Sequence, residues 1–243
     1  MTAGAAQLEA REVSVRFGGL AALSGVSISV VEGEVLGLIG PNGSGKTTLL
    51  NVLSGFVKPV AGELFLDGHR ASGWPSRRLA RNGVGRTFQG VRLFRKLTVR
   101  ENIVIAGLGT GGLGKRPRSA AMGLLELMEL ADVAETPAGS LPYGTQRRVA
   151  LARTLATSPR FLLLDEPAAG LNETETDELM ESVRNVHRER GCGVMIIEHD
   201  VRLIMQLCAR IHVLDYGRTI AEGSPAEIRQ NPVVIEAYLG SAA

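Results

Sequence analysis

Cysteine and aromatic residues are scarce in this chain of 243 residues, which has two cysteines and 4% aromatic residues. Two cysteines are too few for the disulfide framework of a small secreted protein. Cys192 and Cys208 both lie in apolar surroundings, so we expect them to be small, buried core residues.

Long apolar runs are missing as well. None approaches the roughly 18 residues of a membrane-spanning helix. The first seven residues, MTAGAAQ, have neither the basic nor the apolar segment of a signal peptide. We therefore expect a protein that is made and kept in the cytosol, although it could dock on a membrane protein.

A large excess of charge is also absent, since the formal net charge is +2. A general nucleic-acid-binding role therefore has no support from composition, and no nucleic-acid partner is expected. The length is sufficient for a sizeable core and fits one large α/β domain with room for a small insert.

The most informative stretch spans residues 40–47 and reads G-P-N-G-S-G-K-T, the full G-x-x-x-x-G-K-[ST] phosphate-binding pattern. Gly43 and Gly45 let the backbone turn its N–H groups onto an anion. Lys46 can reach the β- and γ-phosphates of a nucleotide, and the Thr47 hydroxyl can bind Mg²⁺. A buried-strand pattern precedes this loop and a helical pattern follows it, which argues against a chance glycine-rich turn.

Two acidic residues follow a second apolar run. Residues 161–164 predict a buried strand, and Asp165 and Glu166 stand at its C-terminal end, where open α/β sheets bind their ligands. Asp165 is suited to support a Mg²⁺ shell, and Glu166 is suited to take a proton from an attacking water. Alone, the pair could equally be a solvated acidic turn, but the phosphate-binding loop upstream favours a nucleotide-hydrolysing site.

The rest of the chain alternates between strands and helices, without internal repeats. Early antiparallel strands are expected beside a parallel core. Between residues 90 and 144 helical patterns dominate, split by a glycine-rich segment at 107–114 that we expect to be mobile. The expected strands are 12–17, 26–31, 35–39, 62–68, 84–87, 161–165, 193–198 and 211–214; the expected helices are 76–82, 99–106, 120–130, one from 146, 174–189, one from 201, 225–230 and 233–239.

Further motifs resemble, in order and spacing, the nucleotide-binding subunits of ABC transporters over essentially the whole chain. Gln89 resembles the family's Q-loop, residues 141–146 (L-P-Y-G-T-Q) its signature, residues 168–172 (A-A-G-L-N) its D-loop and His199 its switch histidine. The resemblance implies an α/β fold in which a P-loop NTPase core with a mainly parallel sheet carries an antiparallel β subdomain and a small helical subdomain. A single ABC ATPase domain is then expected at 7–243, with core and antiparallel subdomain at 7–89 and 146–222, helical subdomain at 90–145 and short C-terminal helices at 223–240.

The resemblance also implies ATP and Mg²⁺ as ligands and a role for each motif. Phe17 would stack on adenine, Glu166 would be the general base and His199 would position the γ-phosphate, while Lys46 and Gln89 complete the catalytic group. The residues serving Mg²⁺ would be Thr47, Gln89 and Asp165. ATP would lie between the loop of one subunit and the signature of a second subunit. The loop residues are Gly40, Pro41, Asn42, Gly43, Ser44, Gly45, Lys46, Thr47 and Thr48, and the signature residues are Leu141, Pro142, Tyr143, Gly144 and Gln146.

Simpler roles stay open for three of these residues. Phe17 could be a core residue, Gln89 a polar residue at a strand end and His199 a capping or core histidine. The other histidines, His69, His187 and His212, belong to no constellation and are expected to be structural or solvated.

The signature departs from the family's usual Leu-Ser-Gly-Gly-Gln. Pro142 replaces the serine, which removes a hydroxyl and an N–H, and Tyr143 replaces the first glycine. Proline is acceptable at a helix start, so the fold is not threatened, but the phosphate contact across the subunit pair is affected. Asn172 likewise replaces the usual D-loop aspartate, which keeps hydrogen bonding and loses a charge.

Several stretches resemble one branch of this family, the ATPase subunits of branched-chain (hydrophobic) amino-acid importers; they are residues 16–23, 86–89, 92–94, 165–172 and 235–240. The region between Asn102 and the signature is shorter than expected for that branch. Relatives imply two transmembrane permease subunits, an extracytoplasmic solute-binding protein and a second ATPase subunit, non-identical or identical. The implied location is cytoplasmic, on the inner face of the cell membrane. The branch also includes urea and short-chain amide importers and resembles lipopolysaccharide-export ATPases, so these solutes stay open.

Three other classes of protein fit the sequence less well. Soluble ABC ATPases of DNA repair carry long coiled-coil insertions, and those of translation carry two ATPase domains; neither feature is present. A small-molecule P-loop kinase would lack the signature followed by a strand that ends in Asp-Glu. A regulatory module that binds ATP without turnover is favoured slightly by the altered signature and disfavoured by Glu166 and His199.

Overall fold

A computed structural model describes residues 6–114 and 117–239 of the chain. Three stretches lie outside the described residues, namely 1–5, 115–116 and 240–243. The expected C-terminal segment, 223–240, is therefore described without its last residue, Gly240. None of the helices in the described ranges is both long and apolar enough to cross a bilayer.

The central sheet has the strand order β10-β9-β3-β8-β7-β6, with parallel pairing from β9 to β6 and an antiparallel β9–β10 hairpin. All residues of β3, β7 and β8 are buried, as expected for short apolar strands covered on both faces. The strands are β3 (Val35–Ile39), β6 (Val84–Arg86), β7 (Phe161–Asp165), β8 (Gly193–Ile197), β9 (Arg210–Asp215) and β10 (Arg218–Gly223).

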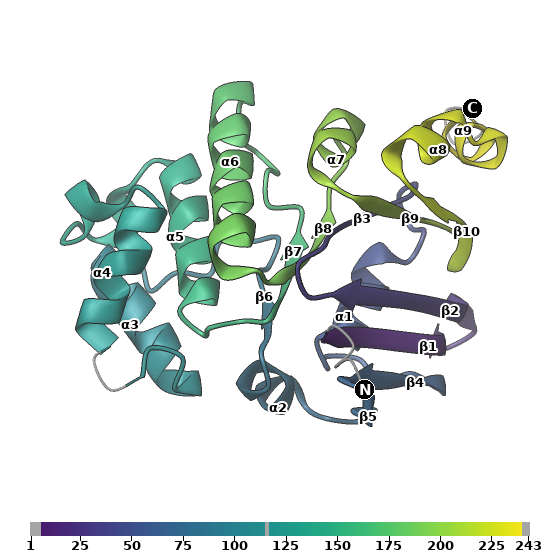
Figure 1. The fold of residues 1–243 in the computed structure, drawn as a ribbon, viewed down its shortest axis with the longest axis horizontal. Helices are drawn as coiled ribbons and strands as arrows, with labels where there is room; N and C mark the ends of the chain where they lie inside the picture. Colours follow the sequence, from purple (N-terminus) through teal and green to yellow (C-terminus); the bar gives the residue numbers. More distant parts are fainter. Residues whose placement is uncertain (1–5, 115–116, 240–243) are drawn as a thin grey trace.

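A second, antiparallel sheet has the order β2-β1-β4-β5, and it lies beside the central sheet in Figure 1. Its strands are β1 (Gln7–Phe17), β2 (Leu20–Val31), β4 (Ala61–Leu66) and β5 (His69–Arg70). β1 and β2 begin earlier than the sequence predicts, at Gln7 and Leu20. Register shifts between Ala10 and Arg16 of β1 lie opposite the start of β2, where they interrupt the two-residue alternation, so this part of β2 was not recognisable. The missed start of β1 pairs with β2 without a shift.

Apolar side chains fill both faces of the central sheet. Leu163 and Met195 face the antiparallel sheet and α1 (Lys46–Leu53), whereas Leu162 and Ile196 face the covering helices. Successive strand residues point to opposite faces, so each strand contributes to both packing layers. The other helices are α2 (Ser76–Arg81), α5 (Tyr143–Leu155), α6 (Glu173–Arg190), α7 (Val201–Leu207), α8 (Pro225–Gln230) and α9 (Pro232–Leu239).

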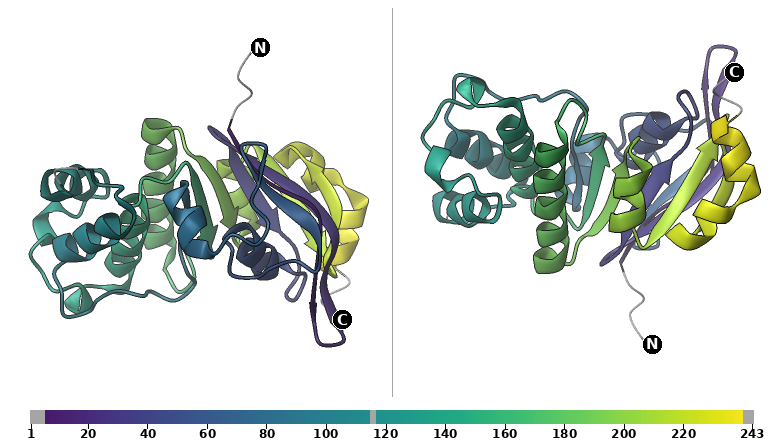
Figure 2. Two further views of the ribbon diagram at one scale, coloured as in Figure 1. Left: turned by 90° about the horizontal axis from the view of Figure 1, so that it is seen from below. Right: turned by 90° about the horizontal axis from the view of Figure 1, so that it is seen from above.

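The middle of the chain is helical, and α3 (Val99–Thr110), α4 (Pro117–Leu127) and α5 lie together at one end of the molecule (Figures 1 and 2). The predicted helix end at Ala106 is wrong, because α3 continues to Thr110. A Cβ on Gly107 would lie 2.2 Å from Cγ of Leu113, and one on Gly112 would lie 2.4 Å from the Ala156 carbonyl oxygen. Close packing accounts for these glycines, so the segment is no free linker; the subdomain boundaries stay a prediction.

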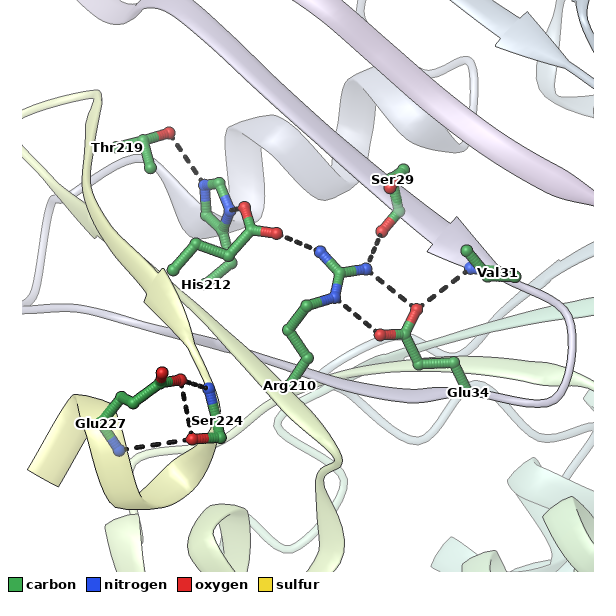
Figure 3. Close-up of polar contacts among 9 residues, drawn as sticks. Ser29, Val31, Glu34, Arg210, His212, Thr219, Ser224 and Glu227 are labelled. Carbon is green, nitrogen blue, oxygen red and sulfur yellow. Dashed lines mark hydrogen bonds and ion pairs between the residues drawn. The ribbon is translucent and has the colours of Figure 1, made fainter.

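A polar network joins β9 and β10 to β2 of the antiparallel sheet (Figure 3), where Nη2 of Arg210 donates to the Ser29 carbonyl oxygen at 2.8 Å. Arg210 bonds to both oxygens of Glu34, at 2.7 and 2.9 Å, and its guanidinium also contacts Glu222. His212 is fully buried, with Nδ1 2.7 Å from Oε2 of Glu222 and Nε2 2.9 Å from Oγ1 of Thr219. His212 is therefore structural, which is one of the two roles expected for it.

Candidate functional site

The phosphate-binding loop joins the end of β3 to the start of α1 and depends on glycine at two close approaches. Gly40 and Gly45 have φ of 149° and 104°. A Cβ would lie 2.0 Å from the Leu214 carbonyl oxygen at Gly40 and 2.7 Å from the Ala22 carbonyl oxygen at Gly45. Gly45 caps α1 without a side-chain bond, so the first N–H groups of the helix point into the loop, where an anion would be stabilised.

Lys46 folds back into this loop. Its Nζ donates to the carbonyl oxygens of Gly40 and Pro41 at 2.7 and 2.8 Å, and the residue is only 6% exposed. Burial lowers the pKa of Lys46, while the nearby charges of Glu166 and Asp165 oppose that shift. The ammonium group is thus held by the loop and is close enough to the acidic end of β7 to feel its charges.

Two supports of the loop were missed in the sequence. The Gly217 N–H, in the β9–β10 turn, donates to the Ser44 carbonyl at 3.0 Å, and the Ser24 N–H donates to the Gly217 carbonyl at 2.8 Å. Tyr238 of α9 also reaches the loop: burial raises the pKa of its hydroxyl, and a hydrogen bond with the Gly40 backbone opposes the rise. The partners in these contacts lie far apart in the chain, so no local pattern marks them.

The structure brings Glu166, Gln89 and His199 together. Nε2 of Gln89 donates to Oε2 of Glu166 at 2.7 Å, and Nε2 of His199 lies 2.8 Å from Oε1 of Glu166. The Glu166 side chain is 14% exposed and that of His199 is 52% exposed. Both oxygens of this carboxylate are therefore held at the edge of the site, accessible to solvent on the histidine side.

Asp165 forms a buried ion pair that the sequence reasoning missed. Nη2 of Arg86 lies 3.0 Å from Oδ2 of Asp165, and the two side chains are 7% and 6% exposed. Burial raises the pKa of Asp165, although Arg86 opposes that shift. Arg86 lies directly before the predicted Q-loop, but nothing local to residues 86–89 shows that it reaches β7.

Glu198, at the end of β8, is a second missed carboxylate. Its Oε1 accepts the Ala168 N–H at 2.7 Å and its Oε2 accepts the His199 N–H at 3.3 Å. Burial raises the pKa of Glu198. This side chain ties the 168–172 segment to the histidine, and its position after a buried strand, like that of Asp165, is a signal that could have found it.

The predicted signature, residues 141–146, lies at the start of α5, and no hydrogen bond in the described ranges joins it to Lys46 or Glu166. Pro142 caps the helix without a side-chain bond, and Nε2 of Gln146 donates to the Leu141 carbonyl at 2.8 Å. A Cβ on Gly144 would lie 2.8 Å from Oε1 of Glu175. Tyr143 is 44% exposed. The aromatic ring of the signature is thus partly exposed, and a Cβ on Gly170 would lie 3.2 Å from Cε1 of Tyr143.

Phe17, the residue expected to stack on adenine, lies at the end of β1 and is 53% exposed. A core role for this ring is therefore wrong, and the ring is free to meet a ligand. Cys192 and Cys208 are buried free cysteines, as expected.

No group of three or more His, Cys, Asp or Glu side chains suited to a metal ion occurs in the stretches that the structure describes. Asp165 is held through Oδ2, and its Oδ1 forms no hydrogen bond within those stretches. Gln89 donates through its amide nitrogen, which leaves its amide oxygen available. Together with the Thr47 hydroxyl, these are oxygen donors of the kind that Mg²⁺ prefers.

Comparisons with known proteins agree with this geometry. The profile of the ABC transporter family matches residues 23–169, and that of the branched-chain amino acid ATP-binding cassette transporter matches residues 218–243. The chain is 46% identical to the high-affinity branched-chain amino acid transport ATP-binding protein BraF of Pseudomonas aeruginosa, over 97% of this chain and 98% of that protein. It is 45% identical to LivG of Salmonella typhimurium, a protein with the same description, over 94% and 95%.

A solved structure gives the same result for the fold. The crystal structure of the ADP conformation of an ATP-binding cassette of an ABC transporter superposes with a TM-score of 0.87 at 30% sequence identity. The superposition covers 97% of this chain and 99% of that one.

Proposed function

This chain belongs to the ABC transporter family as an ATP-binding and ATP-hydrolysing subunit, and from that premise we propose that it powers the uptake of branched-chain amino acids through partner permeases. The observation that carries the ATPase role is the Glu166 carboxylate held by Gln89 and His199 beside the phosphate-binding loop. The solute is proposed from the relatives, because no residue described above would contact an amino acid.

ATP binding begins, in this proposal, with a change of partners at Lys46. Its ammonium group bonds to two neutral carbonyl oxygens of the loop, and the β- and γ-phosphates are charged acceptors that form stronger hydrogen bonds. The N–H groups of residues 40–48 and the start of α1 would bind the remaining phosphate oxygens. Phe17, which is exposed at the end of β1, would stack on adenine.

Hydrolysis would then use Glu166 as the general base. A water placed between the γ-phosphate and the Glu166 carboxylate would give its proton to that carboxylate as it attacks. His199 holds one oxygen of the carboxylate and, being half exposed, can turn to donate to the γ-phosphate. Gln89 fixes the other oxygen, so the base is oriented before the substrate arrives.

Mg²⁺ belongs to this proposal as a companion of ATP. The Thr47 hydroxyl, the amide oxygen of Gln89 and Oδ1 of Asp165 would hold it, and the ion would stabilise the charge of the transferring phosphoryl group. The oxygen donors named above support this assignment.

The assembly would contain a second ATPase subunit, two permeases and an extracytoplasmic binding protein, with this chain on the inner face of the membrane. The absence of a hydrogen bond between the signature and the loop of its own chain, within the described residues, supports a signature that acts on the ATP of the other subunit. The same observation supports the prediction that ATP lies between two subunits.

Uptake of labelled solute in host cells tests the proposed function. Deletion of the gene should abolish high-affinity leucine, isoleucine and valine uptake; the wild-type gene should restore it, and Glu166→Gln should not. Uptake of labelled urea and the amount of lipopolysaccharide at the cell surface serve as controls. Unchanged leucine uptake combined with loss of urea uptake or of surface lipopolysaccharide would transfer the assignment to one of those solutes.

A further inference from the structure

Arg86, the last residue of β6, is a buried side chain for which the proposed function has no use. Its Nη1 donates to Oδ1 of Asn51 at 2.6 Å and to Oγ of Ser54 at 2.9 Å. Its Nη2 donates to Oδ2 of Asp165 at 3.0 Å. One guanidinium group therefore bridges α1 and the end of β7.

The two elements that Arg86 joins carry the groups proposed to serve Mg²⁺. α1 begins with Lys46 and Thr47, and β7 ends with Asp165. A guanidinium group is planar and rigid, so bonds to both elements through its two terminal nitrogens restrict how they can shift relative to each other. Lysine has one terminal nitrogen at the end of a flexible chain and cannot reproduce this fork.

The residues after Arg86 continue the same contact with the end of β7. The Asp165 N–H donates to the Thr87 hydroxyl at 3.3 Å, and Gln89 donates to Glu166. Arg86, Thr87 and Gln89 therefore contact Asp165 and Glu166 in sequence order. The segment 86–89 positions both acidic residues, and Arg86 holds the more deeply buried one.

Aromatic rings restrict the guanidinium group further. Its central carbon lies 5.4 Å from the ring centre of Phe56 and 5.2 Å from that of Phe88. The two rings contact each other edge to face, with centres 5.6 Å apart. Cation–π contact and burial leave Arg86 little freedom to leave Asp165.

We propose that Arg86 is a positioning residue for hydrolysis, which sets the place of the Asp165 carboxylate relative to Thr47 and so the affinity of the site for Mg²⁺ with ATP. This inference rests on the proposed ATPase site. It assigns to Arg86 no contact with ATP or with the ion, and its effect is exerted through Asp165.

The test compares the purified full-length wild type with Arg86→Lys, measuring ATP affinity by calorimetry in EDTA and in Mg²⁺. We expect Mg²⁺ to tighten ATP binding to the wild type and Arg86→Lys to lose most of that gain, with unchanged affinity in EDTA. Turnover at saturating ATP should fall about tenfold or more, as for loss of a charge-assisted hydrogen bond, and KM in Mg²⁺ should rise with the loss of affinity. Asn51→Ala, which removes only the anchor on α1, should reduce the same gain to a smaller extent.

Arg210→Lys is the matched control, because Arg210 also holds a carboxylate, Glu34, by two hydrogen bonds and lies far from Asp165 in the chain. It should lower the melting temperature and leave the Mg²⁺ gain and turnover unchanged. Equal loss of the gain in both lysine variants would show a merely structural role. If Arg86→Lys does not fold, the Asn51→Ala result decides: an unchanged Mg²⁺ gain overturns the proposal.

Failure of the proposed function gives a different result. A wild-type assembly that does not hydrolyse ATP contradicts that function, whatever the variants do. A wild type that hydrolyses ATP, with an Arg86→Lys variant that keeps both the Mg²⁺ gain and the turnover, overturns only the role of Arg86.

Discussion

His199 Nε2 lies 2.8 Å from Oε1 of Glu166, although the two residues are 33 positions apart in the chain. They follow β7 and β8, neighbouring parallel strands in which Asp165 pairs with Ile197. Because parallel strands end at the same sheet edge, Glu166, one residue after β7, and His199, two residues after β8, lie at the same edge. The contact between a carboxylate and a histidine is thus a consequence of strand register.

Glu166→Gln should bind ATP with unchanged affinity and hydrolyse it about 10²- to 10⁴-fold more slowly, because the amide cannot accept a proton from water. Steady-state phosphate release and ATP binding would be measured on the same preparation. The control is Glu181→Gln, a surface residue paired with Arg184, which should behave as the wild type. Near-normal turnover of Glu166→Gln would remove it from the role of general base.

His199→Ala should lower turnover about a hundredfold, the usual effect of losing one donor that stabilises developing charge. If His199 and Glu166 act as one unit, the double variant His199→Ala with Glu166→Gln should be no slower than Glu166→Gln alone. Single-turnover kinetics of the three variants measure this. A hydrolysis rate in the double variant that is reduced by the product of the two single effects would contradict a joint role.

Gly45→Ala should unfold more readily and bind ATP poorly, because its Cβ would lie 2.7 Å from the Ala22 carbonyl oxygen at a φ of 104°. Gly33→Ala is the matched control, with a φ of 81° and no neighbouring atom within 4 Å of the added Cβ. The backbone strain alone should cost about 1 kcal/mol at Gly33, and Gly45 should exceed it. Urea unfolding gives both values; equal values would show that the close approach is unimportant.

The free energy of unfolding should fall as the pH decreases below about 6.5, the ordinary pKa of histidine. Burial lowers the pKa of His212, although Glu222 opposes the shift. The unfolded chain therefore takes up a proton at a higher pH than the folded protein does, and protonation favours unfolding.

His212→Gln should weaken this dependence between pH 7 and 5, as measured by urea unfolding at each pH. Glu222 affects stability at lower pH. Burial would raise the pKa of Glu222, but His212 and Arg210 lower it overall. Its contribution to the free energy of unfolding is therefore lost only as the pH falls below about 4.5. An identical pH profile for the wild type and His212→Gln would contradict the assignment.

Pro142→Ser should be about 1 kcal/mol more stable than Pro142→Ala, because a serine at the N-cap of α5 can accept a backbone N–H where no side chain does so. In a Glu166→Gln background, the serine variant should also pair at lower ATP concentration, since the hydroxyl would strengthen the phosphate contact across the pair. Chemical unfolding and size-exclusion chromatography measure the two effects. Equal pairing of the serine and alanine variants would contradict the second.

The apolar strands of the fold could be predicted closely from the sequence. Residues 161–165 form β7 with the bounds expected. Four apolar residues between a turn and two carboxylates indicate a short buried strand. The end of α3 was predicted wrongly, because glycine at 107 is a weak helix residue and its packing against Leu113 could not be foreseen. The low helix propensity of Gly107 is outweighed there by its packing against Leu113.

Gln89, Glu166 and His199 could be selected from the sequence because polar residues follow predicted strands there, and the structure brings the three side chains together. A residue that contacts a partner far away in the chain could not be selected in this way. Arg86 reaches Asp165, which is 79 residues away, and an arginine after a short strand carries no sign of such a partner. The assigned roles of these residues in ATP hydrolysis stay predictions until the variants are measured.

Tyr238, in the last described helix, touches the backbone of Gly40 at the start of the phosphate-binding loop. An affinity tag fused after residue 243 would therefore lie, along the sequence, only a few residues from Tyr238, whose side chain supports the loop. Preparations tagged at that end would risk altered nucleotide affinity without any change in sequence at the site. For quantitative binding work, the tag belongs at the other terminus or should be removed by a protease.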